Sequence, residues 1–268
     1  MNSQRIDELT PHVLAIARQA GAAILEVYQT PVEVTSKADA SPLTIADLRS
    51  HETIVAGLKA LTPDVPVLSE ESADLSFATR KAWPTFWLVD PLDGTKEFIA
   101  RNGQFTVNIA LIHDHEPVFG VVYVPAHDVM YWGGRDHGAF RQHGTGGAER
   151  IQVQTPAAAP LRVVGSRSHA SAALTNVLPR LGAHELVQVG SSLKFCLIAS
   201  GEADVYPRFG PTSEWDTAAA QAVVEGAGGQ VLANDGTPMR YNSRESILNP
   251  HFVAFGDQSQ NWAQLLFG

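Results

Sequence analysis

Two aspartates with only two residues between them follow a very apolar run, in Trp87-Leu88-Val89-Asp90-Pro91-Leu92-Asp93-Gly94-Thr95. The aromatic and β-branched residues before Asp90 are typical of a buried strand. Pro91 has no N–H to donate, so we expect regular strand pairing to end there and both aspartates to project into a turn at Gly94. Two carboxylates this close repel each other and lose hydration, which indicates a cation between them.

Three further acidic residues could join this pair. Glu70 lies in the segment SEES after a short apolar run, Asp47 ends the segment PLTIAD near the start of a predicted helix, and Asp216 begins another predicted helix in WDTAAA. Each has a plainer interpretation, because Asp47 and Asp216 could complement helix dipoles and Glu70 could be a solvated turn residue. A solvated surface position is a poor explanation for Asp90 and Asp93, because these two acids lie at the end of a very apolar predicted strand.

If Glu70, Asp90, Asp93 and Asp216 converge, they form a site made only of oxygen ligands. Hard oxygen ligands without His or Cys suit Mg²⁺, Mn²⁺ or Ca²⁺ and not zinc. The two aspartates, with the backbone carbonyl of Leu92 between them, can bridge two ions. Two Mg²⁺ ions about 4 Å apart would polarise a phosphate, lower the pKa of a bound water and neutralise the leaving oxygen.

Composition narrows the possible partners. The chain has 268 residues and a net charge of −9, which argues against a nucleic-acid polymer but not against a small phosphorylated ligand. The single cysteine, Cys196, lies in an apolar run, which predicts a buried, unreactive thiol in a reducing compartment. No signal peptide or long apolar stretch stands out, so we expect a soluble cytoplasmic protein.

The helices and strands that must position the acids follow one pattern in the first part of the chain and another in the second part. Helical periodicity covers residues 6–28 and 46–61, and short apolar runs at 65–68, 86–89, 105–111, 118–124 and 129–132 predict an antiparallel or mixed sheet. Beyond residue 160 the pattern alternates between strand and helix, which is typical of an α/β fold. We therefore expect an α+β metal-binding half over 1–157 and an α/β substrate-binding half over 158–268, together forming one catalytic unit.

Several longer motifs resemble one known family. WLVDPLDGT, the preceding Glu-Glu pair and WDTAAAQAVVEGAGG resemble the inositol monophosphatase-like family of Mg²⁺-dependent, lithium-sensitive phosphatases. SKADASPLTIAD, GSRSH, GSSLKFCLIASGEADVYPRFGPTSEWDTAAA and ESILNP resemble its bacterial CysQ-type 3′(2′),5′-bisphosphate nucleotidase branch. That branch hydrolyses 3′-phosphoadenosine 5′-phosphate to AMP and phosphate. The resemblance implies a layered αβαβα sandwich with the site between its two halves.

The resemblance also implies roles for single residues. The metal ions would be held by Glu70, Asp90, the Leu92 carbonyl, Asp93 and Asp216. Thr95 would orient the attacking water. Asp47 would act as the base, as in the nucleotidase branch, whereas Glu70 takes this part in the inositol branch; we favour Asp47 because PLTIAD is intact. The substrate would contact Glu70, Leu92, Asp93, Gly94, Thr95, His169, Ser191, Lys194, Arg208 and Asp216.

A substrate with two phosphates needs positive charge beyond the metal ions. The branch resemblance places His169, Ser191, Lys194 and Arg208 around the second phosphate and the nucleoside. Arg208 can contact a phosphate through two N–H groups and Lys194 through a point charge, and Ser191 or Ser192 would cap the helix that carries Lys194. The plainer interpretation is that Lys194 and Arg208 are surface charges.

The family likeness has further implications for cofactors and partners. It implies two or three Mg²⁺ ions, Mn²⁺ as a substitute, inhibition by Li⁺ and Ca²⁺, and a monomer that recycles the nucleotide in sulfur assimilation. The branch is sometimes peripheral at the cytoplasmic face of the inner membrane, although no basic amphipathic anchor stands out here. Three alternatives remain: an inositol or sugar phosphatase, a protein that binds the nucleotide without turnover, and a structural calcium-binding module.

Overall fold

The computed structural model describes residues 3–30, 42–73, 75–167 and 172–268. Its helices are α1 (Ser3–Gln29), α2 (Pro42–Leu61), η1 (Glu70–Ser72), α3 (Phe77–Arg80), α4 (Thr95–Ile99), η2 (Pro125–His127), α5 (Ala172–Val177), η3 (Leu178–Leu181), α6 (Leu193–Ala199), α7 (Glu214–Gly226) and α8 (Trp262–Phe267). Its strands are β1 (Val67–Ser69), β2 (Thr85–Asp93), β3 (Thr106–His113), β4 (Glu116–Val124), β5 (Val129–Gly134), β6 (Gly138–His143), β7 (Glu149–Ile151), β8 (Leu161–Ser166), β9 (His184–Val189), β10 (Val205–Arg208), β11 (Gln230–Ala233) and β12 (Phe252–Phe255).

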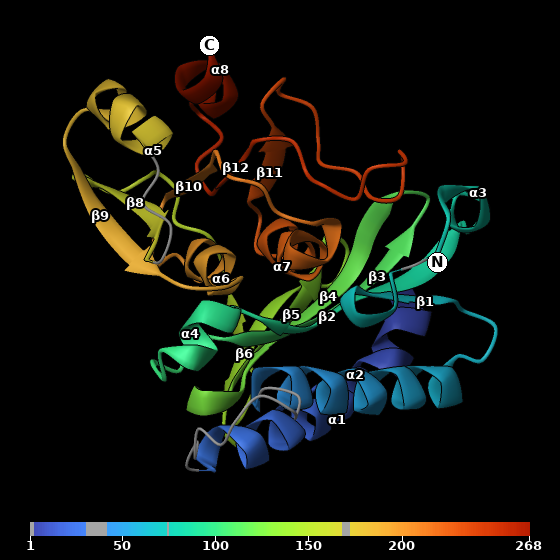
Figure 1. The fold of residues 1–268 in the computed structure, drawn as a ribbon. Coiled ribbons are helices and arrows are strands. Elements are labelled where there is room, and N and C mark those ends of the chain that lie inside the picture. Colours follow the sequence, from blue (N-terminus) through green and yellow to red (C-terminus); the bar gives the residue numbers. More distant parts are fainter. Residues whose placement is uncertain (1–2, 31–41, 74, 168–171) are drawn as a thin grey trace.

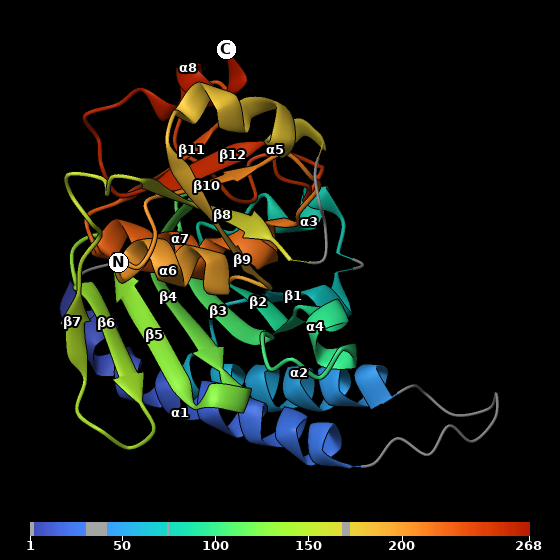
Figure 2. The same cartoon turned by 90° about the vertical axis from the view of Figure 1, so that its left-hand side faces the viewer.

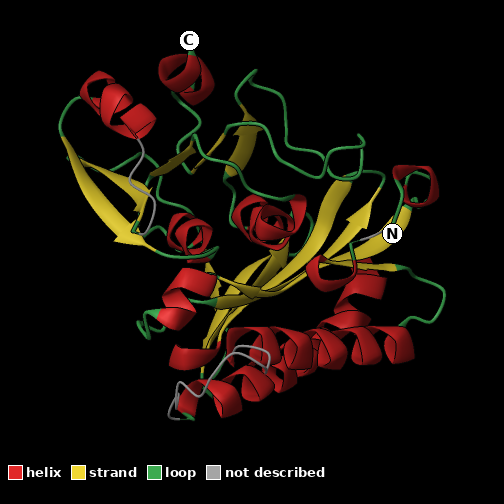
Figure 3. Cartoon of the chain, viewed as in Figure 1, coloured by secondary structure: helices red, strands yellow, loops and turns green. Residues whose placement is uncertain are grey.

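These elements stack in five layers. Helices α1 and α2 cover one face of a seven-stranded sheet in which β1 to β7 follow sequence order, and α6 and α7 cover the other face (Figures 1 and 2). A five-stranded sheet in the order β11-β12-β10-β8-β9 lies beyond α6 and α7, with α5 and α8 on its outer side (Figure 3). The predicted αβαβα sandwich is confirmed.

Burial on both faces explains why β2 is apolar throughout. Trp87 and Val89 pack into the core shared with α1 and α2, whereas Phe86 and Leu88 pack into the core shared with α6 and α7. All four side chains are at most 1% exposed. A strand covered on both sides has no solvent face, so polar residues within it stand out. Asp90 is such a residue.

Helix α7 lies unusually close to the first sheet. A Cβ atom added to Gly120 in β4 would lie 2.1 Å from the carbonyl oxygen of Ala219 in α7. Only glycine permits this approach, because any larger residue would collide with backbone and not with a flexible side chain. A helix from the later part of the chain is thereby seated on the sheet built by the earlier part. The division at residues 157 and 158 stays a prediction.

Two boundary expectations were wrong. Strand β2 does not end at Pro91, because Asp93 still pairs with Thr106 of β3 after a register shift between Asp90 and Asp93. Because the pairing is irregular at Pro91, the strand does not need an N–H donor from the proline. The carbonyl of Pro91 accepts a hydrogen bond of 2.7 Å from the Ser50 hydroxyl of α2. Helix α2 also begins at residue 42, four residues earlier than expected.

The second sheet is tied together by one buried aspartate. The carboxylate of Asp204 accepts hydrogen bonds from the N–H of Ala158 at 3.1 Å and from the N–H and guanidinium of Arg162 at 2.7 to 2.9 Å. The Asp204 side chain is completely buried. Burial alone would raise the pKa of Asp204, but these hydrogen bonds outweigh burial and lower it.

We expect Asp204→Asn to lower the free energy of unfolding by about 3 kcal/mol near neutral pH, because it leaves the Arg162 guanidinium without its anionic partner. Because the pKa of Asp204 is lower in the folded protein than the unfolded pKa of about 3.9, its carboxylate stabilises the fold at pH values above that unfolded pKa. This stabilisation is lost as the pH falls through the pKa of the folded protein. The difference between variant and parent should therefore shrink below about pH 4. Urea unfolding at several pH values measures it.

The control is Asp64→Asn, because Asp64 is an exposed residue in the turn after α2. It should change the free energy of unfolding by less than about 0.5 kcal/mol. Equal effects of the two substitutions would contradict the assigned role of Asp204.

Candidate functional site

A cavity of about 280 Å³ opens where the two halves meet. Its lining residues come mainly from the end of β2 and the starts of α4, α6 and α7. Its lining combines the end of β2 and α4 with residues of the second half: Asp93, Gly94, Thr95, Lys96, Glu97, Ser166, Ser191, Ser192, Lys194, Phe195, Tyr206, Arg208, Pro211, Thr212, Asp216 and Thr217. Seven of the predicted site residues are among them: Asp93, Gly94, Thr95, Ser191, Lys194, Arg208 and Asp216.

Asp90 is the electrostatic centre of the acidic side. It is 1% exposed, and its pKa lies well above the ordinary value because of burial and then because of repulsion from Asp93, Glu70, Asp216 and Asp47. The other four predicted acids therefore lie within electrostatic range of Asp90, although the five come from four separate segments.

The other acids are perturbed for the same reasons. Burial, followed by repulsion from neighbouring carboxylates, raises the pKa of Asp47 to about 8, of Glu70 to about 6 and of Asp216 to about 7. For Asp93, burial raises the pKa while the Lys194 ammonium and a hydrogen bond from the Ser192 N–H oppose the rise. Perturbations of this size concentrate at functional sites.

The donor set fits a hard divalent cation. One carboxylate oxygen of Asp47, Oδ1, is buried and has no hydrogen-bond partner among the described residues. Burial and repulsion between the carboxylates raise the pKa values of the acids and thus favour their protonated forms unless a cation is close. Carboxylate oxygens are the ligands that Mg²⁺, Mn²⁺ and Ca²⁺ prefer. Within the described residues, no three acidic, histidine or cysteine side chains form a ready-made metal-binding group.

Local backbone structure orients the acids. Asp90 Oδ1 accepts a hydrogen bond of 3.0 Å from the N–H of Leu92, which fixes the carboxylate against the irregular end of β2. Gly94 precedes α4 with a φ of 91°, a conformation that favours glycine. Asp216 Oδ2 accepts a hydrogen bond of 2.9 Å from the Ser213 N–H at the start of α7. Asp216 thus serves the helix start, as its plainer interpretation suggested, while it also lines the cavity.

Lys194 and Arg208 form the basic side of the cavity. Lys194 is 7% exposed, and its ammonium donates a 2.6 Å hydrogen bond to the carbonyl of Ser191 and lies 5.6 Å from the ring centre of Tyr206. Burial lowers the pKa of Lys194 to about 8, although the nearby Asp93 carboxylate opposes this. A surface-charge interpretation of Lys194 is therefore wrong. Arg208 lines the cavity, and its guanidinium is held by the carbonyls of Gly210 and Pro211.

A hydrogen-bond network that sequence reasoning missed joins the two sides. The N–H of Ser192 donates to Asp93 Oδ2, and the Ser192 hydroxyl lies 2.8 Å from the Thr106 hydroxyl and 2.7 Å from Asn108 Oδ1. Of the two serines expected to cap α6, Ser192 does not cap it with its side chain, because its hydroxyl contacts β3. The Ser191 hydroxyl accepts a hydrogen bond of 3.4 Å from the Leu193 N–H. The polar residues Thr106 and Asn108 in an otherwise apolar strand were the available signal.

Glu71 is a second residue left without a role by the sequence. Hydrogen bonding and charge repulsion between Glu71 and Asp47 contribute to the raised pKa of Asp47, after burial itself. The predicted base therefore has Glu71 as a direct neighbour. His169, a predicted substrate contact, lies outside the described residues.

Two further observations concern residues away from the acids. The thiol of Cys196 is completely buried, and burial raises its pKa, as expected for an unreactive core cysteine. In the described part of the chain, every helix is too short or too polar to cross a membrane.

The chain was compared with known proteins. The sequence model of the inositol monophosphatase family matches residues 5–265. The chain is 52% identical over 242 residues to the 3′(2′),5′-bisphosphate nucleotidase CysQ of Escherichia coli K12, which covers 90% of this chain and 96% of that protein. It is 39% identical to the protein of the same name from Haemophilus influenzae, over 97% of both chains.

Solved structures agree with this result. The crystal structure of CysQ from Bacteroides thetaiotaomicron, described as a bacterial member of the inositol monophosphatase family, superposes with a TM-score of 0.82 at 42% identity and covers 91% of this chain and 96% of that chain. The inositol monophosphatase from Anabaena shares the fold, with a TM-score of 0.77 at 24% identity over 98% of this chain and 96% of that chain.

The raised carboxyl pKa values predict an unusual pH dependence of stability. At a pH between the unfolded carboxyl pKa of about 4 and the raised pKa values of the folded protein, the folded protein holds protons that the unfolded chain has lost. The free energy of unfolding therefore falls as the pH rises through this range. In EDTA, we expect the melting temperature to fall between about pH 5 and about pH 8, and added Mg²⁺ or Mn²⁺ to remove most of this fall. Thermal unfolding followed by circular dichroism measures both.

Asp90→Asn should flatten the decline in EDTA, because it removes the titratable carboxyl at the centre of the cluster. It should also reduce the stabilisation by metal, because it removes a proposed metal ligand. Asp114→Asn, at an exposed turn residue between β3 and β4, is the control and should behave like the parent protein. If Asp90→Asn showed the same fall of melting temperature with pH and the same stabilisation by metal as the parent protein, Asp90 would not be the centre of an interacting acidic cluster.

Proposed function

The chain belongs to the inositol monophosphatase family, and we propose that it is a metal-dependent 3′(2′),5′-bisphosphate nucleotidase that hydrolyses 3′-phosphoadenosine 5′-phosphate to AMP and phosphate. One observation carries this proposal beyond the comparisons: a single cavity has an acidic side with Asp93 and Asp216 and a basic side with Lys194 and Arg208. The acidic side suits metal ions that bind the scissile phosphate, and the basic side suits a second phosphate of the same substrate.

On the acidic side, the metal ligands would be Glu70, Asp90, the Leu92 carbonyl, Asp93 and Asp216, holding two or three Mg²⁺ ions that Mn²⁺ can replace. When bound, such ions supply charge that polarises the phosphate, lowers the pKa of a water and neutralises the leaving oxygen. Li⁺ and Ca²⁺ are proposed inhibitors, in line with the family resemblance.

Asp47 is the better candidate for the base. Glu70 belongs to the proposed metal set, whereas Asp47 does not, and Asp47 Oδ1 is buried without a hydrogen-bond partner among the described residues. Helix α2, which carries Asp47, contacts α4, which begins at Thr95. In this assignment the Thr95 hydroxyl orients the attacking water, Asp47 accepts its proton, and the N–H groups of Gly94 and Thr95 bind the scissile phosphate.

On the basic side, Lys194 and Arg208, with Ser191 beside them, would bind the second phosphate. A buried ammonium regains the electrostatic stabilisation it lost with its water when a phosphate binds beside it. A phosphatase for a substrate with one phosphate, such as inositol 1-phosphate, would need the acidic side alone, so the basic side favours a substrate with two phosphates. The proposal includes a monomer that recycles this nucleotide in sulfur assimilation.

Phosphate release from three substrates tests the activity. We expect release from 3′-phosphoadenosine 5′-phosphate with Mg²⁺, loss of that release in EDTA, and much slower release from inositol 1-phosphate and fructose 1,6-bisphosphate. A preference for inositol 1-phosphate would leave the metal site standing but contradict the role of Lys194 and Arg208, whereas a preference for fructose 1,6-bisphosphate would contradict only the nucleotide specificity. Nucleotide binding without phosphate release would favour a non-catalytic binding protein.

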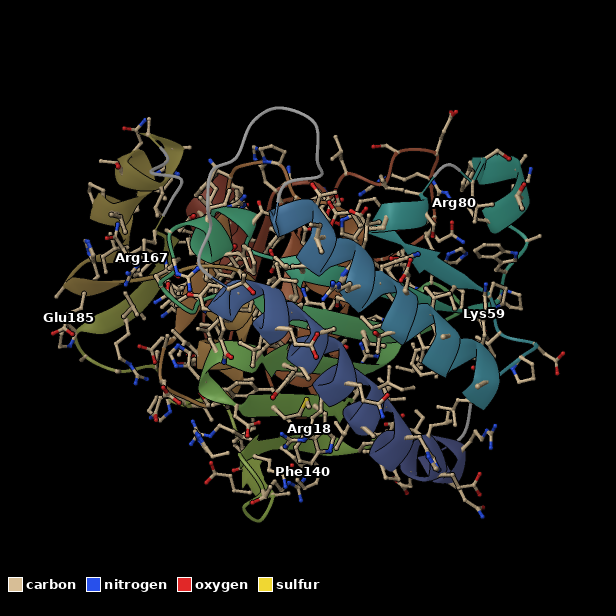
Figure 4. The ribbon with its side chains drawn as sticks, turned by 60° about the horizontal axis from the view of Figure 1, so that its bottom comes forward. Arg18, Lys59, Arg80, Phe140, Arg167 and Glu185 are labelled. Carbon is tan, nitrogen blue, oxygen red and sulfur yellow. The ribbon has the colours of Figure 1, made fainter. Side chains whose placement is uncertain are left out.

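Lys194→Met tests the basic side directly. Methionine keeps the length of the side chain and removes the charge, so we expect KM for the bisphosphorylated nucleotide to rise about tenfold or more, as for loss of one charge-assisted hydrogen bond. The apparent affinity for Mg²⁺ should change much less. Lys59→Met is the matched control, because Lys59 is exposed on α2 (Figure 4). An unchanged KM in Lys194→Met would remove this residue from the site.

A further inference from the structure

One motif of the family resemblance, ESILNP, has no role in the site described so far. It spans residues 245–250 and belongs to an irregular segment between β11 and β12, residues 242–250, that we call the strap. The strap passes beside the start of α7 on the side of α3 (Figure 1). Because α7 begins two residues before Asp216, the strap borders a proposed metal ligand without lining the cavity itself.

Asn249 binds the strap to the residues that precede Asp216. Its side-chain amide donates to the Ser213 carbonyl at 2.7 Å and contacts the hydroxyls of Thr217 at 3.0 Å and Thr212 at 3.1 Å. Its backbone N–H donates to the Thr212 carbonyl at 2.8 Å. One asparagine therefore holds three residues around the first turn of α7.

These contacts lead directly to the proposed metal ligand. The peptide of Ser213 accepts from Asn249 through its carbonyl, and the N–H of the same residue donates to Asp216 Oδ2. The orientation of Ser213 thus determines where one carboxylate oxygen of Asp216 points. Thr212, the other backbone partner of Asn249, lines the cavity.

The opposite end of the strap is anchored by a buried arginine. Arg80, at the end of α3, is 3% exposed, and its guanidinium donates to Asn242 Oδ1 at 2.6 Å and to the Glu245 carbonyl (Figure 4). The Asn242 amide returns a hydrogen bond of 2.7 Å to the Arg80 carbonyl. A buried charge with this many partners holds the strap firmly against α3.

Glu214 completes the attachment to α7. Its side chain is fully buried, and Oε2 accepts from the Asn242 N–H at 2.8 Å. Its own N–H donates to the Ile247 carbonyl at 2.8 Å. The buried guanidinium of Arg80 and the buried carboxyl group of Glu214 thus bind Asn242 from two sides. The start of α7 is therefore fixed from outside the helix at both Glu214 and Ser213.

We propose that the strap is a positioning element for metal binding, in which Asn249 acts through Ser213 to hold the Asp216 carboxylate in its ligand orientation. This inference rests on the proposed metal site. Residues that orient metal ligands typically change metal affinity by about 10- to 100-fold when they are removed. The strap lies outside the cavity, so its effect reaches the metal through Asp216 and not through contact with the substrate.

The test is Mn²⁺ binding by the full chain, measured by isothermal titration calorimetry without nucleotide. We expect Asn249→Ala to raise the Kd for Mn²⁺ about tenfold. Saturating metal should restore most of kcat for phosphate release, because the substrate contacts are intact. Asn261→Ala is the matched control: Asn261 Oδ1 accepts from the Gln264 N–H at the start of α8, which carries no proposed site residue. It should lower the melting temperature and leave the Kd within about twofold.

The second variant keeps the inference testable if Asn249→Ala does not fold. Arg80→Lys retains the charge but loses the paired contacts to the strap, and it should also weaken Mn²⁺ binding. Parental Mn²⁺ affinity in folded Asn249→Ala, or in Arg80→Lys if only that variant folds, would overturn the strap alone. Absence of Mn²⁺ binding by the parent protein would overturn the proposed metal site and the strap with it.

Discussion

Mutual repulsion among buried carboxylates is the constraint on which the rest of this structure depends. Asp90 is buried within the range of four other acids, and such a group favours its neutral form unless a cation is close. The fold must therefore supply enough packing and hydrogen bonding to hold the acids together at a cost in stability. Function is the ordinary reason for a protein to retain such a cost.

The two sheets share the task of holding these acids. Strand β2, β1 with η1, and α2 belong to the first part of the chain, whereas Asp216 arrives on α7 from the second. Because both faces of the first sheet are covered, its strands are rigid supports, and α7 approaches closely enough to require Gly120. The acidic site is consequently a product of inter-layer packing and not of one loop.

The basic side is coupled to the acidic side through backbone and short polar side chains. The Ser192 N–H binds Asp93 across 99 residues of sequence, and its hydroxyl meets Thr106 and Asn108. Lys194 follows two residues later and is held by the carbonyl of Ser191. The group that would bind the second phosphate is thus attached to a proposed metal ligand, which places both parts of a bisphosphorylated substrate within one connected network.

The residues of the sequence predicted most helices and strands and the unusual pair Asp90 and Asp93, and the family resemblance implied the layered sandwich and the full set of acids. Periodicity revealed α1 and most of α2, runs such as 86–89 revealed strands covered on both faces, and WLVDPLDGT placed two acids where solvent could not explain them. Local chemistry suffices for these features, because covalent spacing and burial pattern are written into contiguous residues.

Contacts between distant parts of the chain explain the continuation of β2 past Pro91, the burial of Lys194, the role of the Ser192 hydroxyl and the effect of Glu71 on Asp47. Thr106 on the neighbouring strand sets the register of β2, Tyr206 lies beside Lys194, and β3 binds the Ser192 hydroxyl. A residue's own neighbours in sequence do not specify which distant surface will pack against it. Electrostatic environment and hydrogen-bond partner are therefore set by the arrangement of the layers.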